Sequence, residues 1–68
     1  MENEEKVDLR MESLVDAATV AEILGLSLRT VQDMAARREL PVYKIRRCNR
    51  FLVREMLEWR DQRRVSSF

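Results

Sequence analysis

Positive charge is concentrated in one stretch of the chain, between Arg37 and Arg50. This stretch contains a single acid, Glu39, and six bases: Arg37, Arg38, Lys44, Arg46, Arg47 and Arg50. The net charge of +1 over 68 residues hides this cluster, because residues 1–13 hold five acids and two bases. A dense basic patch attracts polyanions, above all nucleic acid. The chemistry that this segment predicts is therefore the binding of phosphates.

The residue types that build common catalytic and metal sites are scarce. The sequence has no histidine and a single cysteine, Cys48, which removes the usual nucleophile–base pairs and most zinc sites. One glycine, Gly25, is too few for a phosphate-binding loop. We therefore expect no enzyme, no metal and no cofactor. The chain lacks an apolar run of about 18 residues and its acidic start is unlike a signal peptide, so we expect a cytoplasmic protein, nucleoid-associated when bound to DNA.

A second group of side chains, on a predicted helix, suits the recognition of bases. Arg29 lies near the start of this helix, where its guanidinium can bond guanine O6 and N7, and Gln32 can bond adenine N6 and N7. Asp33 can accept from cytosine N4, or hold neighbouring arginines through i,i+4 pairs. A solvated amphipathic helix has the same pattern, so both interpretations stay open. The predicted contacts on this helix are Ser27, Arg29, Thr30, Gln32, Asp33 and Arg37.

Two short helices must position these residues. The first is expected over residues 17–24, with Asp16 as its N-cap and Gly25 as its left-handed end. The second is expected over residues 28–37, with Ser27 as its N-cap. Two short helices joined by a glycine-containing turn are typical of a helix-turn-helix.

A basic β-hairpin, or wing, is expected after the second helix. The runs at residues 42–46 and 50–53 predict two strands with a turn at residues 47–49, and Tyr43 and Ile45 are expected to face inward. Arginines clustered at a hairpin tip suit a narrow minor groove, although charges also protect a sheet edge from aggregation. The predicted wing contacts are Lys44, Arg46, Arg47 and Arg50.

The complete pattern predicts a mainly α fold, a winged helix-turn-helix with three helices and a two-stranded wing. The third helix is expected over residues 54–63, with Met56 and Trp59 docked on the core. We expect residues 14–63 to form this domain, between an acidic, flexible tail at residues 1–13 and a frayed end at residues 64–68.

This order of elements resembles the excisionase-type DNA-binding domain, a branch of the MerR-like winged helix-turn-helix superfamily. The resemblance covers about residues 14–60 and implies a recognition helix in the major groove with a wing on the backbone or in the minor groove. It is carried by Val20-Ala21-Glu22-Ile23-Leu24-Gly25-Leu26-Ser27, Arg29-Thr30-Val31, Glu39-Leu40-Pro41, Lys44-Ile45, the arginines from Arg46 to Arg50, and Met56 with Trp59.

The chain departs from this family at a few positions. Family members usually have glycine where this chain has Arg38 and Arg46, a basic residue at Asp33, and proline at Leu52. Because residues other than glycine disfavour positive φ, we expect both turns to differ in shape here.

The resemblance implies a phage or mobile-element protein that acts in DNA recombination. It would be an excisionase-like recombination directionality factor that binds double-stranded DNA, with an integrase or recombinase or further copies of itself as partners. Two alternatives with the same fold are a small transcriptional regulator and the DNA-recognition domain of a phage terminase. An alternative of another class is a protein-interaction adaptor without DNA binding, which Asp33 and the acidic tail favour.

Overall fold

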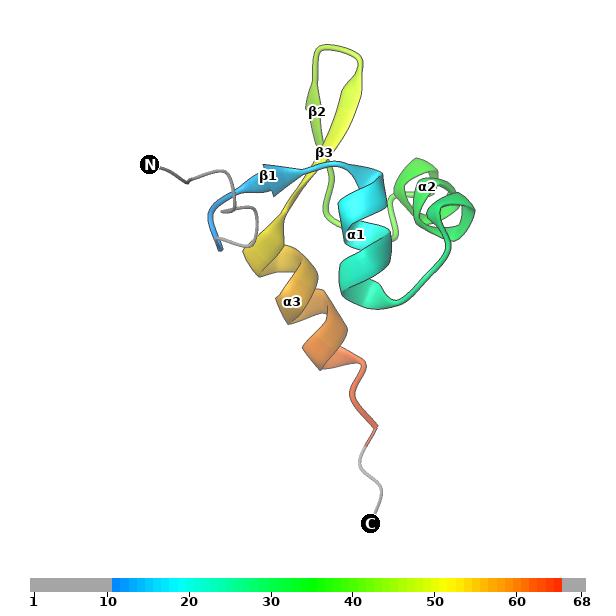
Figure 1. The fold of residues 1–68 in the computed structure, drawn as a ribbon, viewed down its shortest axis with the longest axis vertical. Coiled ribbons are helices and arrows are strands. Elements are labelled where there is room, and N and C mark those ends of the chain that lie inside the picture. The colour runs from blue at the N-terminus through cyan, green and yellow to red at the C-terminus, as the bar shows by residue number, and fades with distance from the viewer. Residues whose placement is uncertain (1–10, 66–68) are drawn as a thin grey trace.

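The fold is a winged helix-turn-helix of three helices and a small antiparallel sheet, the fold class that the sequence predicts (Figure 1). A computed structural model describes residues 11–65, and the predicted properties of the two ends beyond these residues lie outside it. In chain order the elements are β1 (Leu14–Val15), α1 (Ala17–Leu24), α2 (Leu28–Ala36), β2 (Tyr43–Ile45), β3 (Cys48–Leu52) and α3 (Val53–Gln62). Helices α1 and α2 form the helix-turn-helix, and β2 with β3 forms the wing.

Helix α1 has the predicted bounds and the predicted caps. The Asp16 carboxylate accepts hydrogen bonds from the Thr19 amide at 3.0 Å and from the Thr19 hydroxyl at 2.9 Å. The helix ends at Gly25, whose φ of 71° is left-handed. The Leu26 N–H then donates to the Ala21 carbonyl at 2.9 Å. Glycine makes this turn without a steric penalty because it has no Cβ.

Helix α2 ends at Ala36, one residue before the predicted end, and the turn that follows is made by Arg38 with a φ of 61°. The Arg38 N–H donates to the Ala35 carbonyl at 3.1 Å, and the Glu39 N–H donates to the Met34 carbonyl at 2.8 Å. These two bonds define a Schellman motif, whose left-handed position usually holds glycine. The expectation that this turn changes shape without glycine is therefore wrong, because its hydrogen bonds keep the left-handed backbone.

The turn of the wing is also left-handed, and it is shorter than predicted. Strand β2 pairs with β3 as far as Ile45 and Cys48, so the turn contains Arg46 and Arg47 rather than residues 47–49. The φ of Arg46 is 59°, and both favoured two-residue hairpin turns have positive φ at this first position. The expected change of shape is wrong here too. The predicted turn lay too late because the polar start of β3 lacks the β-branched residues typical of a strand.

The face of the wing opposite α2 carries Tyr43 and Ile45, which are not buried in the core, contrary to the prediction, and the Tyr43 hydroxyl donates to Glu55 Oε2 of α3 at 3.2 Å. The exposed fractions of Tyr43 and Ile45 are 41% and 47%. Alternate residues of a strand share a face, so the fully buried Phe51 fixes which side of β3 meets the core. Asn49 and its cross-strand partner Lys44 lie on the same side as Phe51. The wing therefore presents Lys44, not its apolar residues, toward α2.

Strand β1 is a third member of the sheet that the sequence did not predict. It pairs with residues 51–52 of β3, and a strand of two residues is too short to show an alternating pattern. Immediately before it, the Glu12 carboxylate lies 2.9 Å from Arg54 Nε of α3. Residues 11–13, which we assigned to the tail, are thus held against α3, while the division into tail and domain stays a prediction.

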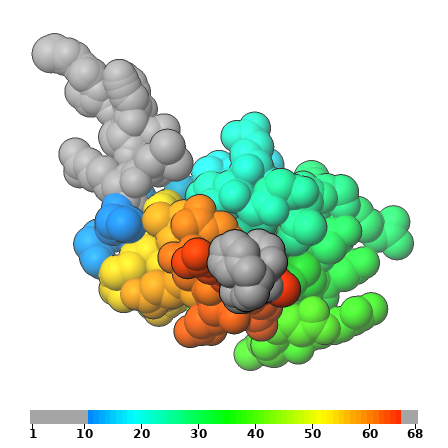
Figure 2. All heavy atoms as spheres, turned by 90° about the horizontal axis from the view of Figure 1, so that it is seen from below, coloured from blue at the N-terminus to red at the C-terminus, as the bar shows by residue number. Residues whose placement is uncertain are grey.

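The core forms where α1, α2, α3 and β3 meet. Its fully buried side chains are Val20, Val31, Phe51, Val53 and Met56. Helix α3 runs one residue ahead of its predicted range, and it buries Met56 as predicted, while Trp59 packs at the edge of the core. Helix α1 lies between α3 and α2 in the view of Figure 1 and borders both in Figure 2. The outer face of α2 is thus left uncovered by the rest of the described chain. No described helix is long and apolar enough to cross a membrane.

Candidate nucleic-acid interface

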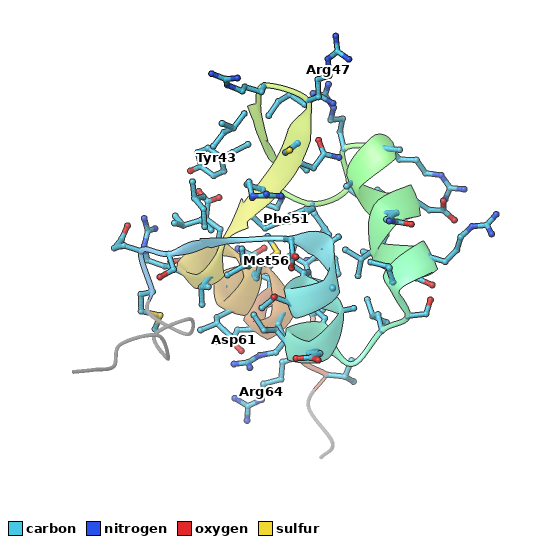
Figure 3. All side chains as sticks on the ribbon, turned by 45° about the horizontal axis from the view of Figure 1, so that its top comes forward. Tyr43, Arg47, Phe51, Met56, Asp61 and Arg64 are labelled. Atoms are coloured by element: carbon cyan, nitrogen blue, oxygen red, sulfur yellow. The ribbon has the colours of Figure 1, made fainter. Side chains whose placement is uncertain are left out.

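The exposed face of α2 carries the residues that we predicted for base recognition. Val31 and Ala35 are 0% and 3% exposed and face α1, so the intervening residues point outward. In Figure 3 the long side chains of α2 extend away from the molecule. The exposed residues are Arg29, Thr30, Gln32, Asp33 and Arg37, with Ser27 at the start of the helix.

The start of α2 has two hydroxyl groups, one that caps the helix and one that can donate a hydrogen bond to a ligand. Ser27 Oγ accepts a hydrogen bond from the Thr30 amide at 3.1 Å and donates to Thr30 Oγ1 at 2.9 Å. The Ser27 hydroxyl therefore serves the cap, whereas the Thr30 hydroxyl keeps its own proton for an outside acceptor. The free amides of this first turn add the positive end of the helix dipole. This end of α2 suits a phosphate, with Thr30 as the donor and Ser27 as the cap.

Two arginines of α2 have nearby acids. Arg29 Nε lies 3.8 Å from Asp33 Oδ2, which confirms the predicted i,i+4 pair. Arg37 pairs with Glu39 at 3.8 Å, and not with Asp33 as predicted, because the chain turns back at the end of α2. The Arg29 side chain is 85% exposed, and ion pairs between such exposed side chains contribute little stability. A polyanion can therefore compete for both arginines.

The tip of the wing carries positive charge that no described carboxylate compensates. Lys44, Arg46 and Arg47 are exposed, and none of them forms an ion pair with a carboxylate among residues 11–65. Figure 3 shows Arg47 at the outermost point of the wing, at the end of the molecule away from Arg64. Like charges held together at a tip concentrate positive potential there.

Arg50 does not belong to the tip cluster in which the sequence placed it. It pairs with Tyr43 lower on the wing, is partly buried, and donates from Nη1 to the Asn49 carbonyl at 3.1 Å. Its charge also acts on Asp16, whose pKa is lowered first by the hydrogen bonds from Thr19 and further by Arg50. Because the hairpin turn comes earlier than predicted, Arg50 lies at the base of the wing, beside the start of α1.

Two neighbouring hollows join α2 to the wing, and Asn49 of β3 lines both. The first, of about 230 Å³, is lined by Ala35, Ala36, Arg38, Val42, Lys44 and Asn49. The second, of about 370 Å³, is lined by Asp16, Ala17, Ala18, Leu28, Gln32, Asn49 and Arg50. Lys44 therefore lines one hollow, and Gln32 and Arg50 line its neighbour, so helix and wing residues border the same part of the surface.

Sequence reasoning missed Arg38 and Asn49 as lining residues. In the sequence, Arg38 was notable only as part of the charge cluster and as a departure from glycine. Asn49 was placed in the hairpin turn, so its position at both hollows was hidden. The alternation that places Asn49 on the same side as Phe51 was the available signal, once the turn is put at the two preceding arginines.

The described surface offers charge and hydrogen-bond donors rather than a metal site. Among residues 11–65, no three side chains of histidine, cysteine, aspartate or glutamate are grouped to hold a metal ion. Cys48 is a free, exposed thiol next to Arg46 and Arg47.

A protein-family model described as a helix-turn-helix domain matches residues 14–64, which include both helices of the motif, the wing and α3. The family consists of excisionase-like DNA-binding domains, so the resemblance noted from the sequence is confirmed. No curated protein and no solved structure matches the chain. With its fold, its exposed helix and its basic wing in agreement with that match, the chain belongs to this helix-turn-helix domain family, and membership implies that it binds DNA.

Proposed function

We propose that the protein binds duplex DNA with α2 in the major groove and the wing on the adjacent backbone or in the minor groove. The observation that carries this proposal is the pair of neighbouring hollows between α2 and the wing, together with the wing cations Lys44, Arg46 and Arg47, which form no ion pair within residues 11–65. The major groove of B-DNA is wide enough for an α-helix. A wing beside that helix then reaches the neighbouring strand.

The base contacts in this proposal come from the outer face of α2. Arg29 bonds guanine O6 and N7, and Gln32 bonds adenine N6 and N7. Asp33 lies 3.8 Å from the Arg29 guanidinium and can orient it. This exposed pair is weak, so Asp33 only biases the orientation of Arg29, and it can also accept from cytosine N4.

The phosphate contacts come from both elements and supply most of the affinity. Thr30 donates its hydroxyl proton at the start of α2, and Arg37 reaches the backbone from its end. On the wing, Lys44 and Arg50 face the backbone, while the tip arginines Arg46 and Arg47 enter the minor groove, whose negative potential accepts them. Contacts of this type make affinity depend strongly on salt.

Within this activity we propose an excisionase-like role as a recombination directionality factor. The support is the family match and the size of the interface, because one helix and one wing read only a few base pairs. Useful specificity then requires several copies on neighbouring sites, which bend the DNA and assist an integrase or recombinase. A regulator acting as a single copy would protect one short site, whereas this role predicts a footprint over several adjacent sites.

A gel-shift titration with random duplex DNA at several salt concentrations tests the binding proposal. If about four phosphates are neutralised, the log–log slope of affinity against salt is about −3.6. The variant Arg46→Ala/Arg47→Ala should weaken binding at least about tenfold and reduce the slope by about 1.8, because two phosphate contacts are lost. The matched control is Arg60→Ala/Arg64→Ala, which removes equal charge from α3 and the turn after it.

Two results would contradict the proposal. Failure of the wild-type protein to bind duplex at low salt would favour the protein-interaction adaptor instead. An equal loss of affinity in both double variants would mean that net charge, and not the wing, determines binding.

A further inference from the structure

Arg38 has a backbone conformation that a side chain disfavours. Its φ of 61° places it at the left-handed position of the Schellman motif that ends α2. Glycine is the ordinary residue there, because a Cβ approaches the following carbonyl oxygen in this conformation. An arginine at this position destabilises the fold relative to glycine, so its presence calls for a compensating role.

The neighbouring structure imposes this conformation whatever the residue is. The Glu39 N–H donates to the Met34 carbonyl at 2.8 Å, and the Glu39 carbonyl accepts from Trp59 Nε1 of α3 at 3.1 Å. The next side chain, Leu40, is 3% exposed in the core. The backbone on the C-terminal side of Arg38 is thus fixed to α2, to α3 and to the core. A cation near the last carbonyls of a helix gains from the helix dipole, but this gain is smaller than the penalty of the left-handed backbone, so local folding does not account for arginine in place of glycine.

Arg38 is exposed and lines the hollow of about 230 Å³ between the end of α2 and the wing. Lys44 and Asn49 line the same hollow from β2 and β3. Neither Arg38 nor Lys44 forms an ion pair within residues 11–65, whereas the adjacent Arg37 pairs with Glu39. Two cations and an amide therefore border one concavity, with no described acid to compensate them.

The end of a helix normally disfavours an anion because its last carbonyls are unsatisfied. At the end of α2, however, the Met34 and Ala35 carbonyls are occupied by the N–H groups of Glu39 and Arg38. The Schellman motif thus turns two acceptors away from solvent and leaves the positive side chains to determine the local potential.

We propose that this hollow binds one backbone phosphate of the DNA through Arg38 and Lys44, with the Asn49 amide as a further donor. The proposal rests on the DNA-binding function proposed above and adds Arg38 and Asn49 to its contacts. The phosphate lies where the DNA backbone passes between α2 and the wing. Its contact with both elements therefore fixes the angle between α2 and the duplex. The left-handed backbone at Arg38 lowers the stability of the fold, and the phosphate contact of its side chain raises the affinity for DNA. The gain in affinity explains why arginine stands at this position.

The test is to give position 38 the residue that its backbone prefers. Arg38→Gly should raise Tm by about 4–8 °C. Glycine removes the penalty of the left-handed backbone, and the resulting gain in stability shifts Tm by this amount in a domain of about 70 residues. The same change should weaken duplex binding about three- to tenfold and reduce the salt slope by about 0.9, because one phosphate contact is lost. A gain in stability combined with a loss of affinity is the signature, since a purely structural residue would move both in the same direction.

Two control variants separate charge from position. Arg38→Lys keeps a cation on the same backbone, so its Tm and salt slope should stay near those of the wild type. Arg64→Ala removes one positive charge at the end of the molecule away from the wing (Figure 3) and should change affinity less than about twofold.

The outcomes distinguish this inference from the function on which it rests. If the wild-type protein binds duplex and Arg38→Gly binds equally well with the same salt slope, the phosphate site is wrong and the proposed function stands. If the wild-type protein does not bind duplex at all, both are wrong. An equal loss of affinity in Arg64→Ala would also overturn the site, because the effect would then come from net charge.

Discussion

Helices α1 and α2 are built from the same local parts but differ at both ends. Each begins with a side chain that accepts from the amide three residues on, which is the Asp16 carboxylate in α1 and the Ser27 hydroxyl in α2. Each ends in a left-handed turn closed by backbone hydrogen bonds, with Gly25 after α1 and Arg38 after α2. The backbone is thus capped in the same way twice, with different residues.

The difference follows the surface that each helix serves. At both ends of α2, the residue used is the more positive alternative: a neutral hydroxyl in place of a carboxylate, and a cation in place of glycine. Helix α1 uses a carboxylate and a glycine at these positions, and the pKa of Asp16 is lowered mainly by the hydrogen bonds from Thr19 and further by the charge of Arg50. The comparison indicates that α2 gives up some stability at its end, where arginine replaces glycine, for a surface compatible with phosphate.

The largest expected effect comes from giving α1 the ending of α2. In Gly25→Arg, the added Cβ meets no atom within 4 Å, so the change tests the left-handed backbone alone. We expect a loss of about 1–2 kcal/mol in the free energy of unfolding, measured by urea denaturation. Gly25→Ala should lose a similar amount, which excludes the new charge as the cause. If both variants were as stable as the wild type, the conformation would carry no penalty, and the argument that Arg38 is retained for binding would lose its basis.

The two turns also mark how far the sequence predicts this fold. The caps Asp16, Gly25 and Ser27 were predicted correctly because a capping residue satisfies local hydrogen bonds that depend on few neighbours. The turns at Arg38 and Arg46 were not, because their shape is imposed by strand pairing and by contacts with distant residues. Local preference favours another conformation for arginine, and tertiary structure overrides it.

The sequence likewise predicts one part of the candidate site and not the other. The outer face of α2 was predictable because one buried stripe determines which residues of a helix are exposed. Strand β1, the face that carries Tyr43 and the position of Asn49 depend on the register of the sheet. A shift of the hairpin turn by one residue changes which side chains face α2, and a sequence with two consecutive arginines at the turn gives no glycine to mark it.

A smaller effect is expected from giving α2 the N-cap of α1. Ser27→Asp keeps a good cap, since the two residues are nearly equivalent there and a carboxylate suits the helix dipole. Stability should therefore be unchanged or slightly higher. Duplex binding should weaken about five- to tenfold, because the new carboxylate meets the phosphate expected at Thr30. Gel-shift titrations at fixed salt measure the affinity, and thermal melts confirm the fold. Undiminished binding would mean that the start of α2 does not approach the backbone.

The smallest expected effect concerns the N-cap of α1 and appears only at low pH. Hydrogen bonds from Thr19 and the charge of Arg50 hold the pKa of the Asp16 carboxyl below its ordinary value of 3.8. As the pH falls, the unfolded chain takes up this proton first. The stability that Asp16 contributes is therefore fully present above the ordinary pKa and is lost as the pH falls through the lower pKa of the folded state.

The variant Asp16→Ser keeps a cap without a titrating group and should change Tm by less than about 2 °C at pH 7. Urea midpoints of the two proteins, measured from pH 7 down to pH 2, should therefore differ by an amount that shifts in favour of the serine variant below pH 3.8. Glu12, whose pKa is lowered by the hydrogen bond and charge of Arg54, gives both proteins the same additional loss in acid and cancels in the comparison. A difference that stayed constant with pH would show that α1, like α2, needs only the hydrogen bond of its cap and not the charge, and the contrast between the two helix starts would then rest on DNA binding alone.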